Sequence, residues 1–136
     1  MNETLAFEIT TRGRFADELP RVETALAAEG FGILTRIDVA ATFAKKLSRE
    51  FRPYQILGAC NPELAHRALT TRPDAGLLLP CTVTVEAAPD GGTTIRIADP
   101  QAMLGLGDFA DDEAVRAVAL EARQRLERVA TALRKA

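Results

Sequence analysis

Residues 54–62 read YQILGACNP, and this stretch decides how the rest of the chain is interpreted. Residues 54–60 are nearly all apolar, which is typical of a strand inside a sheet. Asn61 is a favoured helix N-cap and Pro62 a favoured first helical residue, so a helix is predicted to follow at once. The stretch therefore predicts a buried strand that ends at Cys60 and leads into a helix.

Similar patterns extend to both sides of this stretch. Alternating apolar and polar residues predict strands at 5–9, 31–39, 79–86 and 93–97, and the turn at 89–92 joins the last two into a hairpin. Apolar residues at spacings of three and four predict helices before residue 30, around 41–48, after 61 and over 115–133. Residues 72–76 are predicted to form a loop. The predicted order is βαβαβαββα.

The polar face of most strands sets the fold class. Parallel strands covered on both sides tend to be continuously apolar, whereas these strands alternate. The sequence therefore favours an α+β fold, a sandwich with a mixed or antiparallel sheet of about five strands and helices mainly on one face. A parallel α/β sheet is the alternative, because strands and helices alternate along the chain. Residues 1–136 are expected to form a single domain.

The first and last helices carry signals at their ends. Proline fits best in a first turn, so Pro20 predicts that the first helix begins near Asp17. Gly30 is predicted to end it in the left-handed conformation, with Phe31 folding back onto the last turn. The acidic residues at 111–113 suit the start of the last helix, where they complement the helix dipole.

Composition argues against several classes of protein. The net charge is −2, from 17 basic and 19 acidic residues, so the basic excess typical of nucleic-acid binders is absent. Six Phe, one Tyr and no Trp offer few surfaces for base stacking. No apolar run approaches the ~20 residues of a membrane span, and no signal peptide is visible. We therefore expect a cytoplasmic protein with neither nucleic acid nor membrane as partner.

Two cysteines are the main candidates for chemistry. Cys60 precedes a predicted helix N-terminus, which can lower a thiol pKa and favour a reactive or ligand-binding thiolate. The alternative is a small buried hydrophobe, because free cysteine is among the most buried residue types. Cys81 lies on the apolar face of its strand with Val83 and Val85, which favours a core position. On adjacent strands the two thiols could form a redox couple, although their spacing is not CxxC.

Other motifs add little to this picture. With His66, the only histidine, Cys60 and Cys81 would supply three ligands of an open metal site, but a solvent-facing histidine is the simpler interpretation. The single serine, Ser48, lies in no G-x-S-x-G motif, and neither a P-loop nor G-x-G-x-x-G is present. The apolar connection at 99–107 is expected to cover a core edge, a pocket or a partner.

Four short motifs occur in a fixed order: Gly30-Phe31, the run 58–62, Leu79-Pro80-Cys81, and Asp99-Pro100 after the hairpin. Together, over about residues 7–103, they resemble the domain-of-unknown-function family numbered 302. The resemblance implies a small α/β sandwich, often a homodimer, with no assigned reaction. It carries over the motif positions Cys60, Asn61, Pro62, Pro80, Cys81, Asp99 and Pro100.

Three functions follow as hypotheses. The first is a homodimeric binding module that holds a small ligand or metal near Cys60, Asn61 and Cys81. The second is a thiol-redox enzyme in which Cys60 attacks and Cys81 resolves. The third is a structural or interaction protein whose cysteines belong to the core. Binding is favoured because the chain offers few acid–base or nucleophilic groups beyond the thiols; the cofactor and any reaction stay open.

Overall fold

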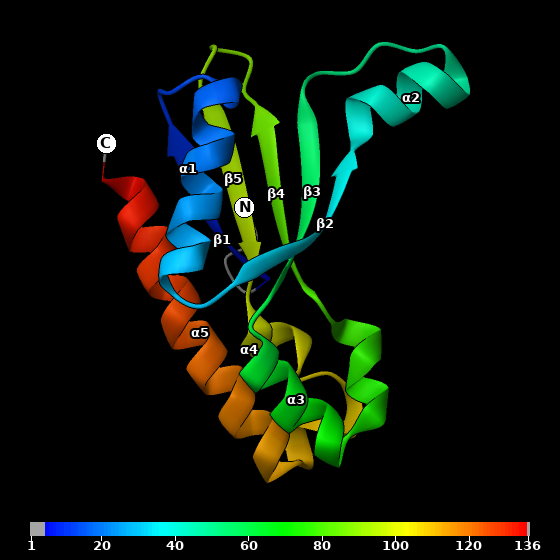
Figure 1. Cartoon of the computed structure of the whole chain (residues 1–136), viewed down its shortest axis with the longest axis vertical. Coiled ribbons are helices and arrows are strands. Elements are labelled where there is room, and N and C mark those ends of the chain that lie inside the picture. Colours follow the sequence, from blue (N-terminus) through cyan, green and yellow to red (C-terminus); the bar gives the residue numbers. More distant parts are fainter. Residues whose placement is uncertain (1–4, 136) are drawn as a thin grey trace.

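The computed structural model describes residues 5–135, which form a five-stranded sheet and its helices (Figure 1). The strands are β1 (Ala6–Thr11), β2 (Gly32–Asp38), β3 (Tyr54–Cys60), β4 (Cys81–Ala87) and β5 (Thr93–Ala98). Their order across the sheet is β1-β5-β4-β3-β2. The predicted hairpin is β4 and β5, and the N-terminal strand lies at the far edge beside β5.

All four strand pairings are antiparallel. Within them Glu8 lies opposite Arg96, and Ala59 lies opposite Cys81. The α+β prediction is therefore confirmed, and the parallel alternative is wrong. The α+β fold was predicted because most strands have a polar side, and these polar sides together form one face of the sheet.

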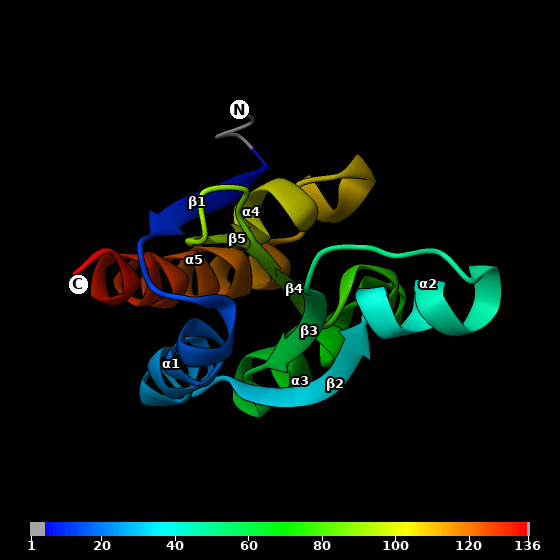
Figure 2. The same ribbon diagram turned by 90° about the horizontal axis from the view of Figure 1, so that it is seen from above.

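Two helices, α1 (Phe15–Ala28) and α5 (Glu113–Arg134), cover one face of the sheet, and Figure 2 shows both on the same side. Between them and the sheet lies the core, whose fully buried side chains include Ile9, Val22, Leu26, Leu57, Val83, Val85, Ile95, Ile97, Val115 and Leu126. Asp112 caps α5 by accepting a hydrogen bond from the Val115 N–H, 3.0 Å away. Within residues 5–135, α5 and every other helix fall short of the length and apolarity that a bilayer span requires.

The end of α1 matches its prediction and the start does not. Gly30 has φ +85°. The Phe31 N–H donates to the Leu26 carbonyl at 2.9 Å, and the Gly30 N–H donates to the Ala27 carbonyl. These two hydrogen bonds form a Schellman motif. The helix begins at Phe15, two residues before the predicted start, and Pro20 lies inside it. Phe15 packs against the core, and that contact extends the helix beyond the limit that proline suggested.

Two further helices, α3 (Pro62–Thr71) and α4 (Pro100–Met103), lie at one end of the sheet and both contact α5. Two short 3₁₀ segments, η1 (Pro73–Leu78) and η2 (Gly107–Asp111), lie in the same region. The predicted loop at 72–76 is thus largely helical. Asp99 caps α4 by accepting a hydrogen bond from the Gln101 N–H at 2.9 Å.

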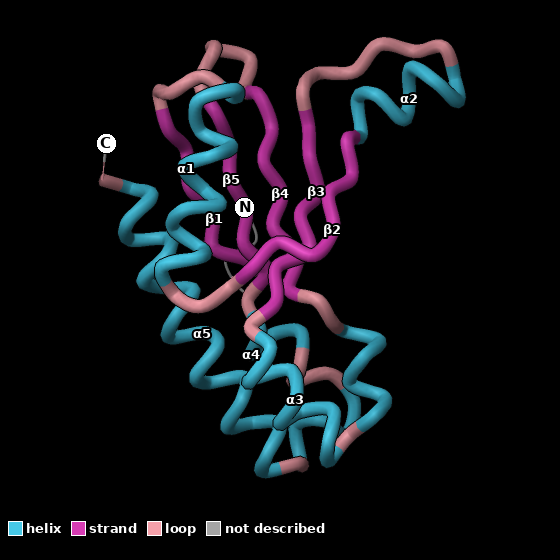
Figure 3. The backbone as a smooth tube through the Cα atoms, in the orientation of Figure 1, coloured by secondary structure: helices cyan, strands magenta, loops and turns pink. Residues whose placement is uncertain are grey.

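The remaining elements, β2 and α2 (Val39–Leu47), extend away from the core, and the tube in Figure 3 shows α2 apart from the other helices. The alternation over 31–39 would give this strand one buried side, formed by Phe31, Ile33 and Ile37, and a wet side with Leu34. Leu34 is indeed exposed, but Ile37 is 48% exposed, so the prediction of a buried side is wrong for the second half of β2. No residue of α2 is buried. β2 is an edge strand that curves away beyond α1 (Figure 2), and its register shifts between Ile33 and Thr35, so that Ile37 lies opposite Ile56.

Candidate functional site

The face of the sheet turned away from α1 and α5 carries a hollow with mainly apolar walls. On β4 and β5 the core takes Val83, Val85, Ile95 and Ile97, and alternation therefore places Thr84, Arg96 and their neighbours on the opposite face. The hollow encloses about 320 Å³. Its walls come from β1, β3, β4 and β5 and from the segments at one end of the sheet: Leu5, Ala6, Tyr54, Leu78, Leu79, Pro80, Cys81, Thr82, Thr84, Arg96, Ala98, Pro100, Met103 and Leu104.

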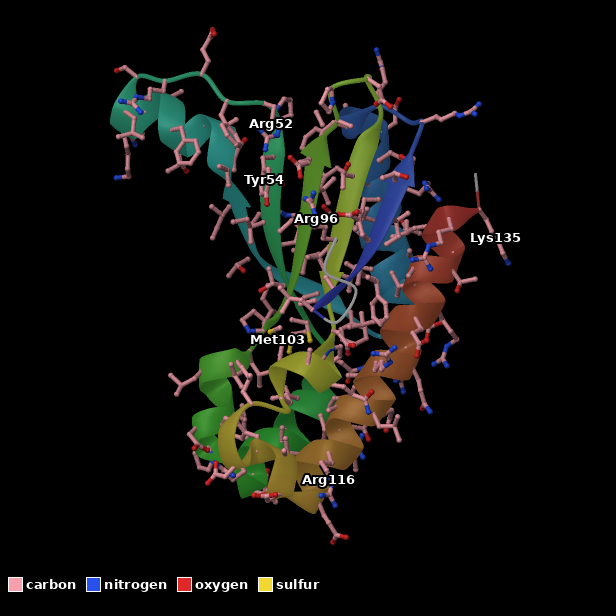
Figure 4. All side chains as sticks on the ribbon, turned by 180° about the vertical axis from the view of Figure 1, so that it is seen from behind. Arg52, Tyr54, Arg96, Met103, Arg116 and Lys135 are labelled. Carbon is pink, nitrogen blue, oxygen red and sulfur yellow. The ribbon has the colours of Figure 1, made fainter. Side chains whose placement is uncertain are left out.

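A row of alternating charges crosses the sheet beside this hollow. Arg96 donates from Nε to Glu8 at 2.9 Å and from Nη1 to Glu86. Arg52 donates from Nε to the other carboxylate oxygen of Glu86 at 2.6 Å. Figure 4 shows Arg52, Tyr54 and Arg96 along this face, with Met103 at its lower end. The row holds two positive and two negative side chains, so its charges balance.

Glu86 is the centre of this row and is only 7% exposed. Burial on its own raises the pKa of Glu86, but hydrogen bonds from Arg96 and Arg52 outweigh it and keep the pKa below its ordinary value. The hydrogen bond to Glu86 in turn raises the pKa of Arg96. Glu86 and Arg96 therefore both favour their charged forms, and each charge in the row already has a partner.

The structure places the predicted candidates Cys60, Asn61 and Cys81 around a second, very small hollow of about 30 Å³. That volume holds about one water molecule. The two cysteines lie on adjacent strands, but the residue opposite Cys81 is Ala59, so Cys60 is one position beyond that pairing. Both thiols are free. Of the three candidates, only Cys81 also lines the larger hollow.

Neither thiol has the lowered pKa expected of a reactive cysteine. Burial raises the pKa of Cys60, so the expected effect of the helix N-terminus does not prevail. Burial also raises the pKa of Cys81, to about 11. Because the thiolate is the nucleophile and the metal ligand, these raised pKa values disfavour the reactive form of both side chains at neutral pH.

The metal interpretation lacks its ligands. Among residues 5–135, no group of three His, Cys, Asp or Glu side chains is arranged to hold a metal ion. His66 is an exposed residue of α3 and lines neither of the two hollows. The solvent-facing interpretation of this histidine is therefore the one that the structure favours.

Asn61 has a clear structural role. Its Oδ1 accepts a hydrogen bond from the Leu64 N–H at 3.1 Å, and Pro62 follows as the first residue of α3. The predicted N-cap is confirmed. Positioning α3 is thus enough to account for Asn61.

Replacing Asn61 by alanine is expected to lower the free energy of unfolding by about 1 kcal/mol, because α3 loses its N-cap hydrogen bond. Chemical denaturation measures the change. Asn61→Asp keeps an acceptor at the same place and serves as the control. A loss in Asn61→Asp as large as in Asn61→Ala would contradict the capping role.

The apolar connection at 99–107 serves both the core and the larger hollow. Leu104 is 4% exposed and belongs to the core, while Met103 and Leu104 also line the hollow. Asp99, itself 4% exposed, forms an ion pair with Arg123 of α5 and so fixes the start of this segment. Leu106 is 54% exposed. Of the three expected roles, core cover and pocket wall are both observed.

Sequence reasoning missed Tyr54, Thr84 and Arg96 as wall residues of a site. The alternation of Arg96 with Ile95 and Ile97 predicts that Arg96 lies on the polar face of the sheet. The residues that it contacts there belong to other strands, and alternation does not identify them. Glu8 lies 88 residues away in sequence and meets Arg96 only through the β1–β5 register. The strand order was the missing information.

Comparisons with known proteins agree with the fold. A solved structure described as an uncharacterized conserved protein DUF302 from Bacillus stearothermophilus superimposes with a TM-score of 0.83 at 28% sequence identity. The match covers 95% of this chain and 98% of that one. No curated protein matches the chain. Residues 7–133 match the family described as Domain of unknown function DUF302, and the chain therefore belongs to that family.

Proposed function

We propose that this protein is a homodimeric binding module that holds a small molecule in the larger hollow, beside Cys81. The observation that carries the proposal is the hollow itself, about 320 Å³ on a sheet face that α1 and α5 leave uncovered. Its size and its mainly apolar walls with a few polar groups are typical of small-molecule sites. In this proposal the ligand lies beside Cys81, whereas Cys60 and Asn61 line only the smaller hollow.

Binding is better supported than thiol chemistry. The raised pKa of Cys81 keeps its sulfur protonated and suits it to an apolar wall. Cys60 and Cys81 are not opposite each other in the register, which weakens the pairing of an attacking and a resolving thiol. Arg96 and Glu86 are already bonded to each other, so neither is free to transfer protons.

The proposed second copy of the chain contacts the extension formed by β2 and α2. Leu34, Ile37, Leu47 and Phe51 are exposed there by 66%, 48%, 56% and 36%. Ile37 and Phe51 line one open apolar depression, and exposed apolar surface of this kind supports an interaction site. β2 is also an edge strand, and antiparallel pairing of two identical edge strands is two-fold symmetric, as a homodimer requires.

The test uses the fluorescence of Tyr54, which lines the hollow. The chain has no other tyrosine and no tryptophan, so its fluorescence reports on the hollow. Titration with 1-decanol and with decanoate is expected to give a saturable change with one molecule per chain for at least one of the two. Light scattering on the same micromolar sample is expected to give the mass of a dimer. Two flat titrations would overturn the binding site, and a monomer mass would overturn the homodimer.

A further inference from the structure

We infer that the ligand of the larger hollow is uncharged, mainly apolar and built of about ten non-hydrogen atoms. This inference rests on the proposed function and specifies its ligand class. Three observations carry it: the volume of the hollow, the balance of charges beside it, and the hydroxyl groups in its wall.

The volume sets the size of the ligand. A water molecule in the liquid takes up about 30 Å³, and a chain carbon with its hydrogens is of similar size, so 320 Å³ has room for about ten such groups. The apolar part of the wall comes from separate segments, including Leu5, Leu79, Pro80 and Met103. A chain of about ten carbons would replace water against these side chains, which is favourable.

The charges beside the hollow exclude an ionised ligand group. Among residues 5–135, Arg96 is the only charged residue in the wall, and it is bonded to both Glu8 and Glu86. Arg52, the nearest further cation of the row, is bonded to Glu86. A carboxylate or phosphate entering the hollow would lose its water without gaining a free cation, and an unpaired buried charge is costly.

The wall nevertheless offers uncharged polar groups. Thr84 Oγ1 is buried and has no hydrogen-bond partner among the described residues. Thr84 lies opposite Ile56 of β3, and Tyr54 is two residues before Ile56 on the same strand. Tyr54 therefore adds a second hydroxyl-bearing side chain to the same wall. A ligand hydroxyl both donates and accepts hydrogen bonds, so it matches these groups without bringing in a charge. An alcohol or another uncharged polar end is therefore favoured over a pure hydrocarbon.

The experiment compares 1-decanol with decanoate at neutral pH, where the carboxyl group is ionised. Tyr54 fluorescence and calorimetry give both dissociation constants. We expect decanoate to bind at least about tenfold more weakly than decanol, because its carboxylate stays unpaired. Equal or tighter binding of decanoate would overturn the inference and leave the binding function standing. Absence of binding by both probes would overturn the proposed function itself.

Glu8→Gln tests whether charge balance is the cause. This variant keeps the shape of the side chain and removes the negative charge of one of the two partners of Arg96. The affinity for decanoate is expected to rise by about tenfold, and that for decanol to stay within about twofold. Unchanged discrimination between the two probes in Glu8→Gln would contradict the role of the charge row. The comparison in the wild-type protein tests the ligand class even if the variant is unstable.

Discussion

Ala98→Phe is expected to weaken the binding of 1-decanol by at least about tenfold, because the phenyl ring occupies the floor of the hollow. Ala98 lies on β5 two residues after Arg96, so its side chain points to the uncovered face, and it lines the hollow. The wild-type methyl group leaves this space open. Calorimetric titration measures the loss, and thermal unfolding shows whether the variant is folded.

Thr94→Phe is the matched control for this variant. Thr94 lies on the same strand and the same face but outside the hollow, so an added ring there is expected to leave decanol affinity within about twofold. If Ala98→Phe binds as tightly as the wild-type protein, the ligand lies elsewhere. If both variants lose binding equally, the effect comes from the sheet and not from the hollow.

Phe31→Ala is expected to lower the free energy of unfolding by about 3–5 kcal/mol, which is the usual cost of removing a buried phenyl ring. Phe31 is 2% exposed and is the largest fully buried side chain of the described residues. It also follows Gly30 in the Schellman motif that ends α1. The variant therefore leaves a cavity at the junction of α1, β2 and the core, and denaturant unfolding measures the cost.

Phe31→Leu separates the ring's volume from its apolar character. Leucine keeps most of the apolar volume, so the expected cost is about 1 kcal/mol. A loss below about 1 kcal/mol in Phe31→Ala would contradict the central packing role of this side chain. Equal losses in both variants would show that the ring shape, and not its volume, matters.

The sequence predicted features that depend on neighbouring residues. The N-cap at Asn61, the end of α1 at Gly30 and the hairpin through residues 89–92 each result from a few consecutive residues. The start of α1 and the exposure of β2 were predicted wrongly because distant contacts decide them. Phe15 packs against the core at the start of α1, and the register shift between Ile33 and Thr35 pairs Ile37 with Ile56 on the face that α1 and α5 leave uncovered.

The candidate site was predicted only in part. Cys81 and the connection at 99–107 do line the larger hollow, and both were singled out for their apolar character at element ends. Tyr54 and Arg96 were not predicted as site residues, because a site on the face of a sheet is formed by side chains from several strands. Antiparallel register brings Glu8, Arg96 and Thr84 side by side, and alternation within one strand does not reveal its neighbours.

The position of β1 at the sheet edge has a consequence for how the protein folds. β4 and β5 close a short hairpin in which Ala87 pairs with Thr93, whereas β1 pairs Ala6 with Ala98 across most of the chain. Long closures cost more chain entropy and form more slowly. We therefore expect β1 to join the sheet late. Because Leu5 and Ala6 belong to the wall of the hollow, we expect that wall to be complete only once β1 has docked.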